Sequence, residues 1–152
     1  MKSYAENKKG YFNYEILDEF EAGLVLSGGE VKSIRDGKIS IRESFATIKN
    51  GEIWLTNAHI NPYEPAKEND YEPTRPRKLL LSRGEIDKII GKLTNDGYTL
   101  IPLKIYDKKG KIKALIGLVR GKKKHDKREI IKKRDRKRDL AKDLKEKSTK
   151  NP

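Results

Sequence analysis

The stretch SFATIKNGEIWLTNAHI, residues 44–60, predicts a β-hairpin. Asn50 and Gly51 at its centre are a residue pair that accepts positive φ at both corners of a tight type I′ turn. The segments on either side carry the aromatic and β-branched residues that are typical of strands. The apolar residues on the two flanks are Phe45, Ile48, Ile53 and Leu55.

The segments before and after this hairpin predict further strands, a short helix and a long loop. Residues 14–26 have the composition of a strand, and residues 30–38 fit a short helix that ends at a glycine. Residues 61–78 hold four of the six prolines, which indicates an extended loop, and a loop of this length in a compact domain usually has a function. Residues 98–120 contain two strand-like runs joined by DKKG, which predicts a second hairpin.

A helix is predicted to begin after the long loop, in the sequence SRGEIDKIIGKL. Ser82 and Glu85 have the spacing of a capping box, in which each side chain accepts a hydrogen bond from a free backbone N–H group. The following apolar residues recur at the spacing of one helix face. They are Ile86, Ile89, Ile90 and Leu93.

Five or six strands with antiparallel connections and few helices favour a mainly β, OB-like antiparallel barrel. We expect two or three helices to flank it and a basic C-terminal tail to follow it. An SH3-like barrel or an open sheet with one helix fits the same strand count. The predicted divisions are a flexible N-terminus (1–12), an OB-like barrel (13–120) and a basic tail (121–152).

Positive charge is concentrated at the end of the chain. The formal net charge is +13, and the residues from Arg120 onward supply +10 of it, with 16 of the 36 Lys and Arg and 6 of the 23 Asp and Glu. Such a tail favours a polyanionic partner, either nucleic acid or an anionic membrane surface, because binding releases counterions. We expect the free tail to be disordered and to become helical in a polyanionic groove, since it has little apolar surface to bury.

Composition disfavours several other classes of protein. The chain has no cysteine, no signal-peptide core and no apolar run of membrane-spanning length, so we expect a soluble cytoplasmic protein without a membrane association. His59 and His125 are its only histidines, and its acids show no spacing of a metal site or an acid–base pair. We therefore expect no enzyme activity and no cofactor or metal, although a small nuclease remains the alternative from another class.

Candidate binding residues occur in the long loop and near the N-terminus. Arg75, Arg77 and Lys78 lie on a proline-stiffened segment, and an arginine side chain matches phosphates and base edges. Three aromatic residues near the N-terminus, Tyr11, Phe12 and Tyr14, could stack on exposed bases. Packing in the core explains these aromatic side chains equally well.

Three motifs in this order resemble the SsrA-binding protein family (small protein B). They are EFEAGLVLSGGEVKSIRDGK, PTRPRKLLLSRGEIDKIIGK and GLVRGKKKHDKREIIKKRD, and the resemblance extends over roughly residues 7–140. It implies an OB-type barrel that binds the tRNA-like domain of tmRNA, also called SsrA RNA, and delivers it to stalled ribosomes in trans-translation. A monomer without catalytic activity is implied, with a general ribosome-associated OB-type RNA chaperone as the alternative.

The resemblance also implies which residues bind. In the barrel, the positions that match the family's RNA contacts or neighbour them are Tyr14, Glu21, Glu30, Lys32, Arg75, Arg77, Lys78, Leu80 and Ser82. Ser82 stands where the family often has Asn or His, and its capping role is the other explanation. In the tail, which is expected to enter the empty mRNA channel and reach the decoding centre, the matching residues are Lys122, Lys123, His125, Asp126, Lys127 and Arg128.

Overall fold

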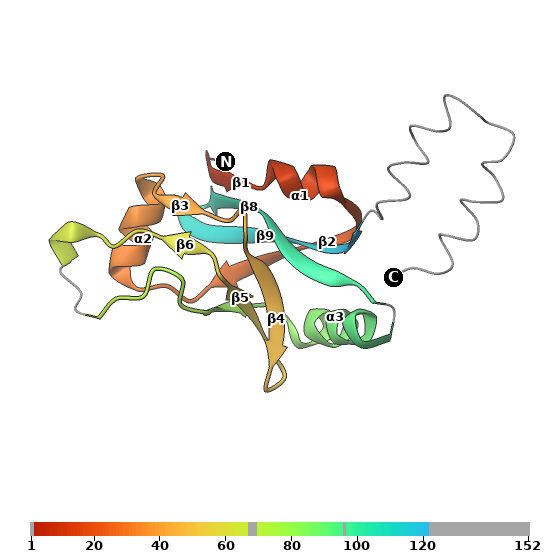
Figure 1. The fold of residues 1–152 in the computed structure, drawn as a ribbon. Helices are drawn as coiled ribbons and strands as arrows, with labels where there is room; N and C mark the ends of the chain where they lie inside the picture. The colour runs from red at the N-terminus through yellow and green to blue at the C-terminus, as the bar shows by residue number, and fades with distance from the viewer. Residues whose placement is uncertain (1, 67–69, 96, 122–152) are drawn as a thin grey trace, which may run out of the picture.

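The computed structural model describes residues 2–66, 70–95 and 97–121. Figure 1 shows strands at the centre of the molecule, with helix α1 above them, α2 at the left and α3 below. In chain order the elements are β1 (Lys2–Glu6), α1 (Lys8–Asn13), β2 (Tyr14–Leu24), α2 (Gly28–Arg35), β3 (Ile39–Ser40), β4 (Phe45–Lys49), β5 (Glu52–Thr56), β6 (His59–Ile60), the 3₁₀ turn η1 (Glu64–Ala66), β7 (Arg77–Leu80), α3 (Arg83–Asn95), β8 (Thr99–Lys108) and β9 (Lys111–Gly121).

Six of the strands close into an antiparallel barrel. Neighbouring strands pair in the order β8, β4, β5, β7, β2 and β9, and β9 pairs back onto β8 to complete the ring. Strand β1 pairs with residues 104–107 of β8, past the point at Leu100 where β4 pairs with that strand, and β3 pairs with β6 in a separate small sheet. The prediction of an OB-like antiparallel barrel with flanking helices is confirmed, and closure leaves few strand edges exposed.

Both predicted hairpins are present. Asn50 and Gly51 have φ angles of 53° and 75°, and Lys109 and Gly110 have 53° and 80°. Two consecutive residues with positive φ define the type I′ turn, whose twist matches that of the flanking strands. The local turn residues therefore set the register of β4 with β5 and of β8 with β9.

The core fills the barrel and extends under α3. Branched aliphatic side chains from the barrel strands point inward, and Ile86 and Ile89 of α3 are buried against them. The predicted capping box at the start of α3 is confirmed, because the Glu85 N–H donates to Ser82 Oγ (3.2 Å) and the Ser82 N–H donates to Glu85 Oε1 (3.1 Å). Helix α3 therefore begins where the sequence predicted and covers the barrel with the predicted face.

The N-terminus differs from the expectation of a flexible segment over residues 1–12. Strand β1 pairs with β8, and the buried Asn7 side chain caps α1. Asn7 Oδ1 accepts from the Gly10 N–H (2.9 Å), while Asn7 Nδ2 donates to the Pro102 carbonyl (3.1 Å). Backbone pairing and one buried amide hold this segment in place. It can therefore be ordered although its sequence is polar and has no stripe of apolar side chains.

No helix in the described ranges is long and apolar enough to span a membrane. The predicted tail division, 121–152, lies outside the described residues except for Gly121, which ends β9.

Candidate nucleic-acid interface

The nine predicted binding residues of the barrel occupy different environments rather than one patch. Glu21 of β2 has its partners on β8, Leu80 of β7 lies opposite Gly23 of β2, and Lys32 lies on α2. Tyr14 lies at the other end of β2. Glu30, Arg75 and Arg77 form an ion cluster, Lys78 lies on the outer face of β7, and Ser82 precedes α3.

The ion cluster is built around a buried carboxylate. Glu30 is 1% exposed and Arg77 is 0% exposed. Arg77 donates from Nη2 (2.6 Å) and Nε (3.0 Å) to Glu30 Oε2, and Arg75 donates from Nε to the same oxygen (2.9 Å) and from Nη2 to Glu30 Oε1. Arg77 also donates to the Ala58 carbonyl (2.7 Å), and the Tyr71 hydroxyl accepts from Arg77 (3.0 Å).

Glu30 also closes a capping box at the start of α2. The Ser27 N–H donates to Glu30 Oε1 (2.9 Å), and the Glu30 N–H donates to Ser27 Oγ (3.1 Å). Burial alone raises the pKa of Glu30, but the hydrogen bonds from Arg75, the Ser27 N–H and Arg77 outweigh it and lower that pKa. Burial and the nearby Glu30 carboxylate raise the pKa of Tyr71 to about 12.

The structure therefore corrects the expectation that Glu30 and Arg77 contact RNA. Both side chains are enclosed by the protein, and their charges are used on each other. Their position ties α2 to β7 and to the end of the long loop. Arg75 is 35% exposed, so one side of its guanidinium group remains at the surface beside this cluster.

A groove with basic residues on its rim lies next to the cluster, between α2 and the ends of β2, β7 and β9. Its volume is about 340 Å³. Leu80 is 51% exposed beside it and lies directly opposite Gly23, where an added Cβ would come within 3.3 Å of the Leu80 side chain. The lining residues are Gly23, Leu24, Leu26, Val31, Arg35, Leu80, Gly110, Lys111, Ile112 and Lys113.

This groove combines cations with an apolar floor, as a site for a sugar–phosphate backbone and a base requires. A second hollow shares Val31 and Arg35 with it and continues along α2 past Lys32 and Tyr63. Sequence reasoning missed Arg35, Lys111 and Lys113 as site residues. The only feature that could have pointed to them was a positive charge within a predicted helix or strand, and lysines that simply face solvent share that feature.

Glu21 is held at the surface as an ionised acceptor. The Tyr106 hydroxyl donates to Glu21 Oε2, and Lys108 Nζ lies 3.2 and 3.3 Å from the two carboxylate oxygens. These hydrogen bonds, from Tyr106 first and then Lys108, lower the pKa of Glu21, while burial raises the pKa of Tyr106. A carboxylate in this state can accept a hydrogen bond from a base amino group or a ribose 2′-hydroxyl.

Tyr14 belongs to a third hollow, of about 200 Å³, at the other end of β2 beside α1. Tyr14 and Glu21 are seven positions apart on β2, a span of about 23 Å. The hollow has Lys9 and Arg42 on its border. One ligand that contacts Tyr14 and Glu21 together would have to extend along the whole barrel.

The remaining predicted residues are at the surface. Ser82 is exposed, and its hydroxyl caps α3. Lys78 is half-exposed, with Nζ 3.9 Å from Glu52 Oε1, and His59 is exposed in β6. Within the part of the chain that the structure describes, no group of three or more His, Asp or Glu side chains is arranged to hold a metal ion. The six predicted tail residues, Lys122 to Arg128, lie outside the described residues.

Comparison with known proteins identifies the family. The model of the family described as SmpB protein matches residues 4–146. The SsrA-binding protein of Shouchella clausii is 51% identical over 145 residues, which cover 95% of this chain and 93% of that protein. The SsrA-binding protein of Thermosynechococcus vestitus is 50% identical over 147 residues, 96% of this chain and 97% of that protein.

A solved structure agrees with this result. It is described as "tmRNA-SmpB: a journey to the center of the bacterial ribosome", and one of its chains is 45% identical with a TM-score of 0.66. The match covers 83% of this chain and 92% of that chain. Because the family model and the relatives span nearly all of the sequence, the chain belongs to the SmpB family.

Proposed function

We propose that this protein is an RNA-binding adaptor that binds the tRNA-like domain of tmRNA (SsrA RNA) and delivers it to stalled ribosomes in trans-translation. The observation that carries the proposal is the groove beside Leu80, where Arg35, Lys111 and Lys113 surround an apolar floor and the ionised Glu21 lies nearby. Relatives named SsrA-binding protein and a solved tmRNA-SmpB complex support the same partner.

The barrel and the tail have separate tasks in this proposal. The barrel recognises the folded RNA through shape, backbone charge and a few base or ribose contacts. The tail enters the empty mRNA channel of the small subunit, where Lys122, Lys123 and His125 contact RNA of the decoding centre and the segment becomes helical. The +10 charge of the tail region supports this division, as does the closed barrel, which is complete without it. The adaptor acts in the cytoplasm as a monomer and catalyses no reaction of its own.

The proposal is tested by comparing the full-length protein with a truncation after Gly121. Binding to the tRNA-like end of tmRNA, to bulk tRNA and to duplex DNA is measured at two salt concentrations. We expect both forms to prefer the tRNA-like end, with a preference that survives high salt, because nonspecific binding depends most steeply on salt. If all three nucleic acids bind alike and salt releases them together, the protein is a nonspecific polyanion binder, as a general RNA chaperone would be.

The role of the tail is tested separately with a triple alanine variant at Lys122, Lys123 and His125. We expect its affinity for the tRNA-like domain to remain near that of the wild type, while tagging activity on stalled ribosomes is lost. Loss of tmRNA binding by this variant, with the fold intact, would contradict the division of tasks.

A further inference from the structure

The outer face of β4, β5 and β7 carries the single tryptophan of the chain. Trp54 lies in register with Thr47 on one neighbouring strand and with Lys78 on the other. Ile53 and Leu55 on either side of it are buried in the core, so strand alternation directs the Trp54 side chain away from the barrel interior. A large aromatic ring is thus placed on the outside of the sheet, where the core does not need it.

A hollow of about 230 Å³ lies against this tryptophan. It is lined by Thr47, Lys49, Trp54, Thr56 and Pro76. The indole Nε1–H is out of contact with solvent and has no hydrogen-bond partner within the part of the chain that the structure describes. An unsatisfied donor of this kind costs free energy, and an acceptor group of a ligand can satisfy it if the surrounding side chains shift.

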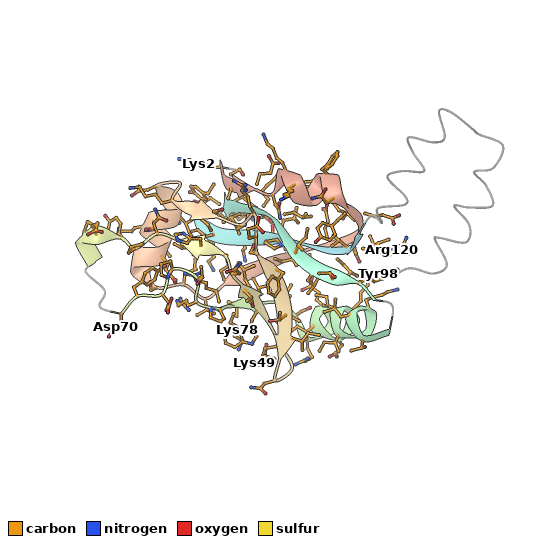
Figure 2. All side chains as sticks on the ribbon, in the orientation of Figure 1. Lys2, Lys49, Asp70, Lys78, Tyr98 and Arg120 are labelled. Carbon is orange, nitrogen blue, oxygen red and sulfur yellow. The ribbon has the colours of Figure 1, made fainter. Side chains whose placement is uncertain are left out.

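Positive charge lies at both ends of the ring. Lys49 is exposed at the end of β4, and Lys78 is half-exposed on β7. Figure 2 labels both residues in the lower part of the barrel, around the β4–β5 hairpin. The Lys78–Glu52 pair is long, at 3.9 Å, and half-exposed, so it holds Lys78 only weakly.

The Trp54 face is continuous with the groove assigned above to RNA. Lys78 and Leu80 are two residues apart on β7, so both point to the outer face, and Leu80 borders the groove. An RNA strand that leaves the groove along β7 therefore meets Lys78 and then Trp54.

We propose that Trp54 is a stacking site for one unpaired nucleobase of a single-stranded RNA segment, with Lys49 and Lys78 binding the flanking phosphates. Base–aromatic stacking between cationic side chains is the usual way in which barrels of this class bind single strands. An apolar protein segment fits the face less well, because two lysines share the single carboxylate of Glu52 there and positive charge remains in excess. The inference rests on the proposed RNA-binding function and extends it to a second, single-stranded contact.

The experiment uses the full-length protein and its intrinsic emission. Because Trp54 is the only tryptophan, the indole fluorescence reports on this face alone. The probes are a dye-labelled, unstructured RNA of about eight nucleotides, within the usual site sizes for this fold, and a blunt RNA duplex of the same composition. Titrations are made at low and at elevated salt, since elevated salt weakens the electrostatic binding expected of the basic tail.

We expect the single-stranded RNA to quench the indole emission and to shield it from acrylamide, and the duplex to do neither. Trp54→Ala should weaken single-strand binding at elevated salt by about 5- to 150-fold, which is the usual range for one stacked base. Trp54→Phe should restore most of the affinity, because it keeps an aromatic ring. The matched control is Tyr98→Ala, which removes a half-buried aromatic ring beside α3 (Figure 2).

The lysines are tested through the salt dependence of the same binding. Removal of Lys49 and Lys78 together should reduce the slope of log K against log salt by about 1 to 2, whereas Trp54→Ala should leave that slope unchanged. Lys2→Ala, an exposed cation on β1, serves as the control.

The proposal is overturned if labelled RNA binds at saturation while the indole emission and its acrylamide accessibility stay the same. It is equally overturned if folded Trp54→Ala binds within twofold of the wild type at elevated salt, or if the indole responds only to a protein fraction of the ribosome. Binding of the tRNA-like domain is measured in the same preparations. Loss of the stacking site alone therefore stays distinguishable from failure of the proposed function.

Discussion

Replacing Glu30 with glutamine should destabilise the protein far more than an exposed substitution of the same kind. Glutamine has nearly the same shape and can still serve in the capping box with Ser27, so the change isolates the loss of charge. Arg77 would keep its guanidinium charge at 0% exposure without a carboxylate partner. Breaking a buried ion pair from one side costs about 3–5 kcal/mol.

That magnitude is large relative to a total stability of about 5–15 kcal/mol for a domain. We expect the midpoint of thermal unfolding to fall by about 10–20 °C for a body of this size. The assay is urea unfolding followed by circular dichroism, with Glu72→Gln as the matched control, because Glu72 is exposed in the same loop. A second variant adds Arg77→Met to Glu30→Gln and should recover part of the loss, since it removes the uncompensated charge.

The pH dependence has a defined sign. The pKa of Glu30 is lower in the folded protein than its ordinary value of 4.5. The ionised Glu30 therefore contributes fully to the free energy of unfolding above pH 4.5, and this contribution is lost as the pH falls through that value towards the folded-state pKa. The Glu30→Gln variant should lack this part of the acid destabilisation. The reasoning would be refuted if the free energy of unfolding of Glu30→Gln lay within about 1 kcal/mol of the wild-type value, or if adding Arg77→Met recovered no stability.

Three further outcomes are expected. Leu80→Ala should weaken binding to the tRNA-like domain about fivefold, while its free energy of unfolding stays within about 0.5 kcal/mol of the wild-type value, because Leu80 is half-exposed at the groove. An equal loss of binding in Leu17→Ala, which changes an exposed leucine on β2, would argue against a specific contact. Asn7→Ala should lower the free energy of unfolding in urea by about 1–2 kcal/mol, because both the α1 cap and the hydrogen bond to the Pro102 carbonyl are lost. A negligible change would mean that the pairing of β1 alone holds the N-terminal segment. Tyr106→Phe should raise the pKa of Glu21 in a carboxyl NMR titration, since the phenolic donor is the main cause of its lowered value, and an unchanged titration would assign that effect to Lys108.

Local signals predicted the elements whose cause is local. The Asn50–Gly51 turn and the Ser82–Glu85 capping box act over four residues or fewer, and the structure confirms both. The ordered N-terminus was missed because β1 depends on β8, about 100 residues away, and because Asn7 finds its acceptor at Pro102. A sequence pattern does not contain such partners.

The candidate site shows the same limit. A charged residue near an RNA-binding motif can be a ligand contact or one half of a buried pair, and composition does not distinguish the two. Glu30 and Arg77 are 47 positions apart in sequence, and only folding brings them together. Arg35, Lys111 and Lys113 converge on one groove for the same reason, although they come from α2 and β9.

Strand β9 has a mechanical consequence for the whole protein. It runs for eleven residues from Lys111, at the groove, to Gly121, where the chain leaves the barrel. Ten steps at about 3.3 Å place these two points about 33 Å apart. Pairing with β2 on one side and β8 on the other makes this interval rigid. An RNA bound at the groove, as proposed, would therefore lie at a fixed offset from Gly121. A partner held at the Gly121 end would have a high effective concentration for that RNA only where their own spacing matches this offset.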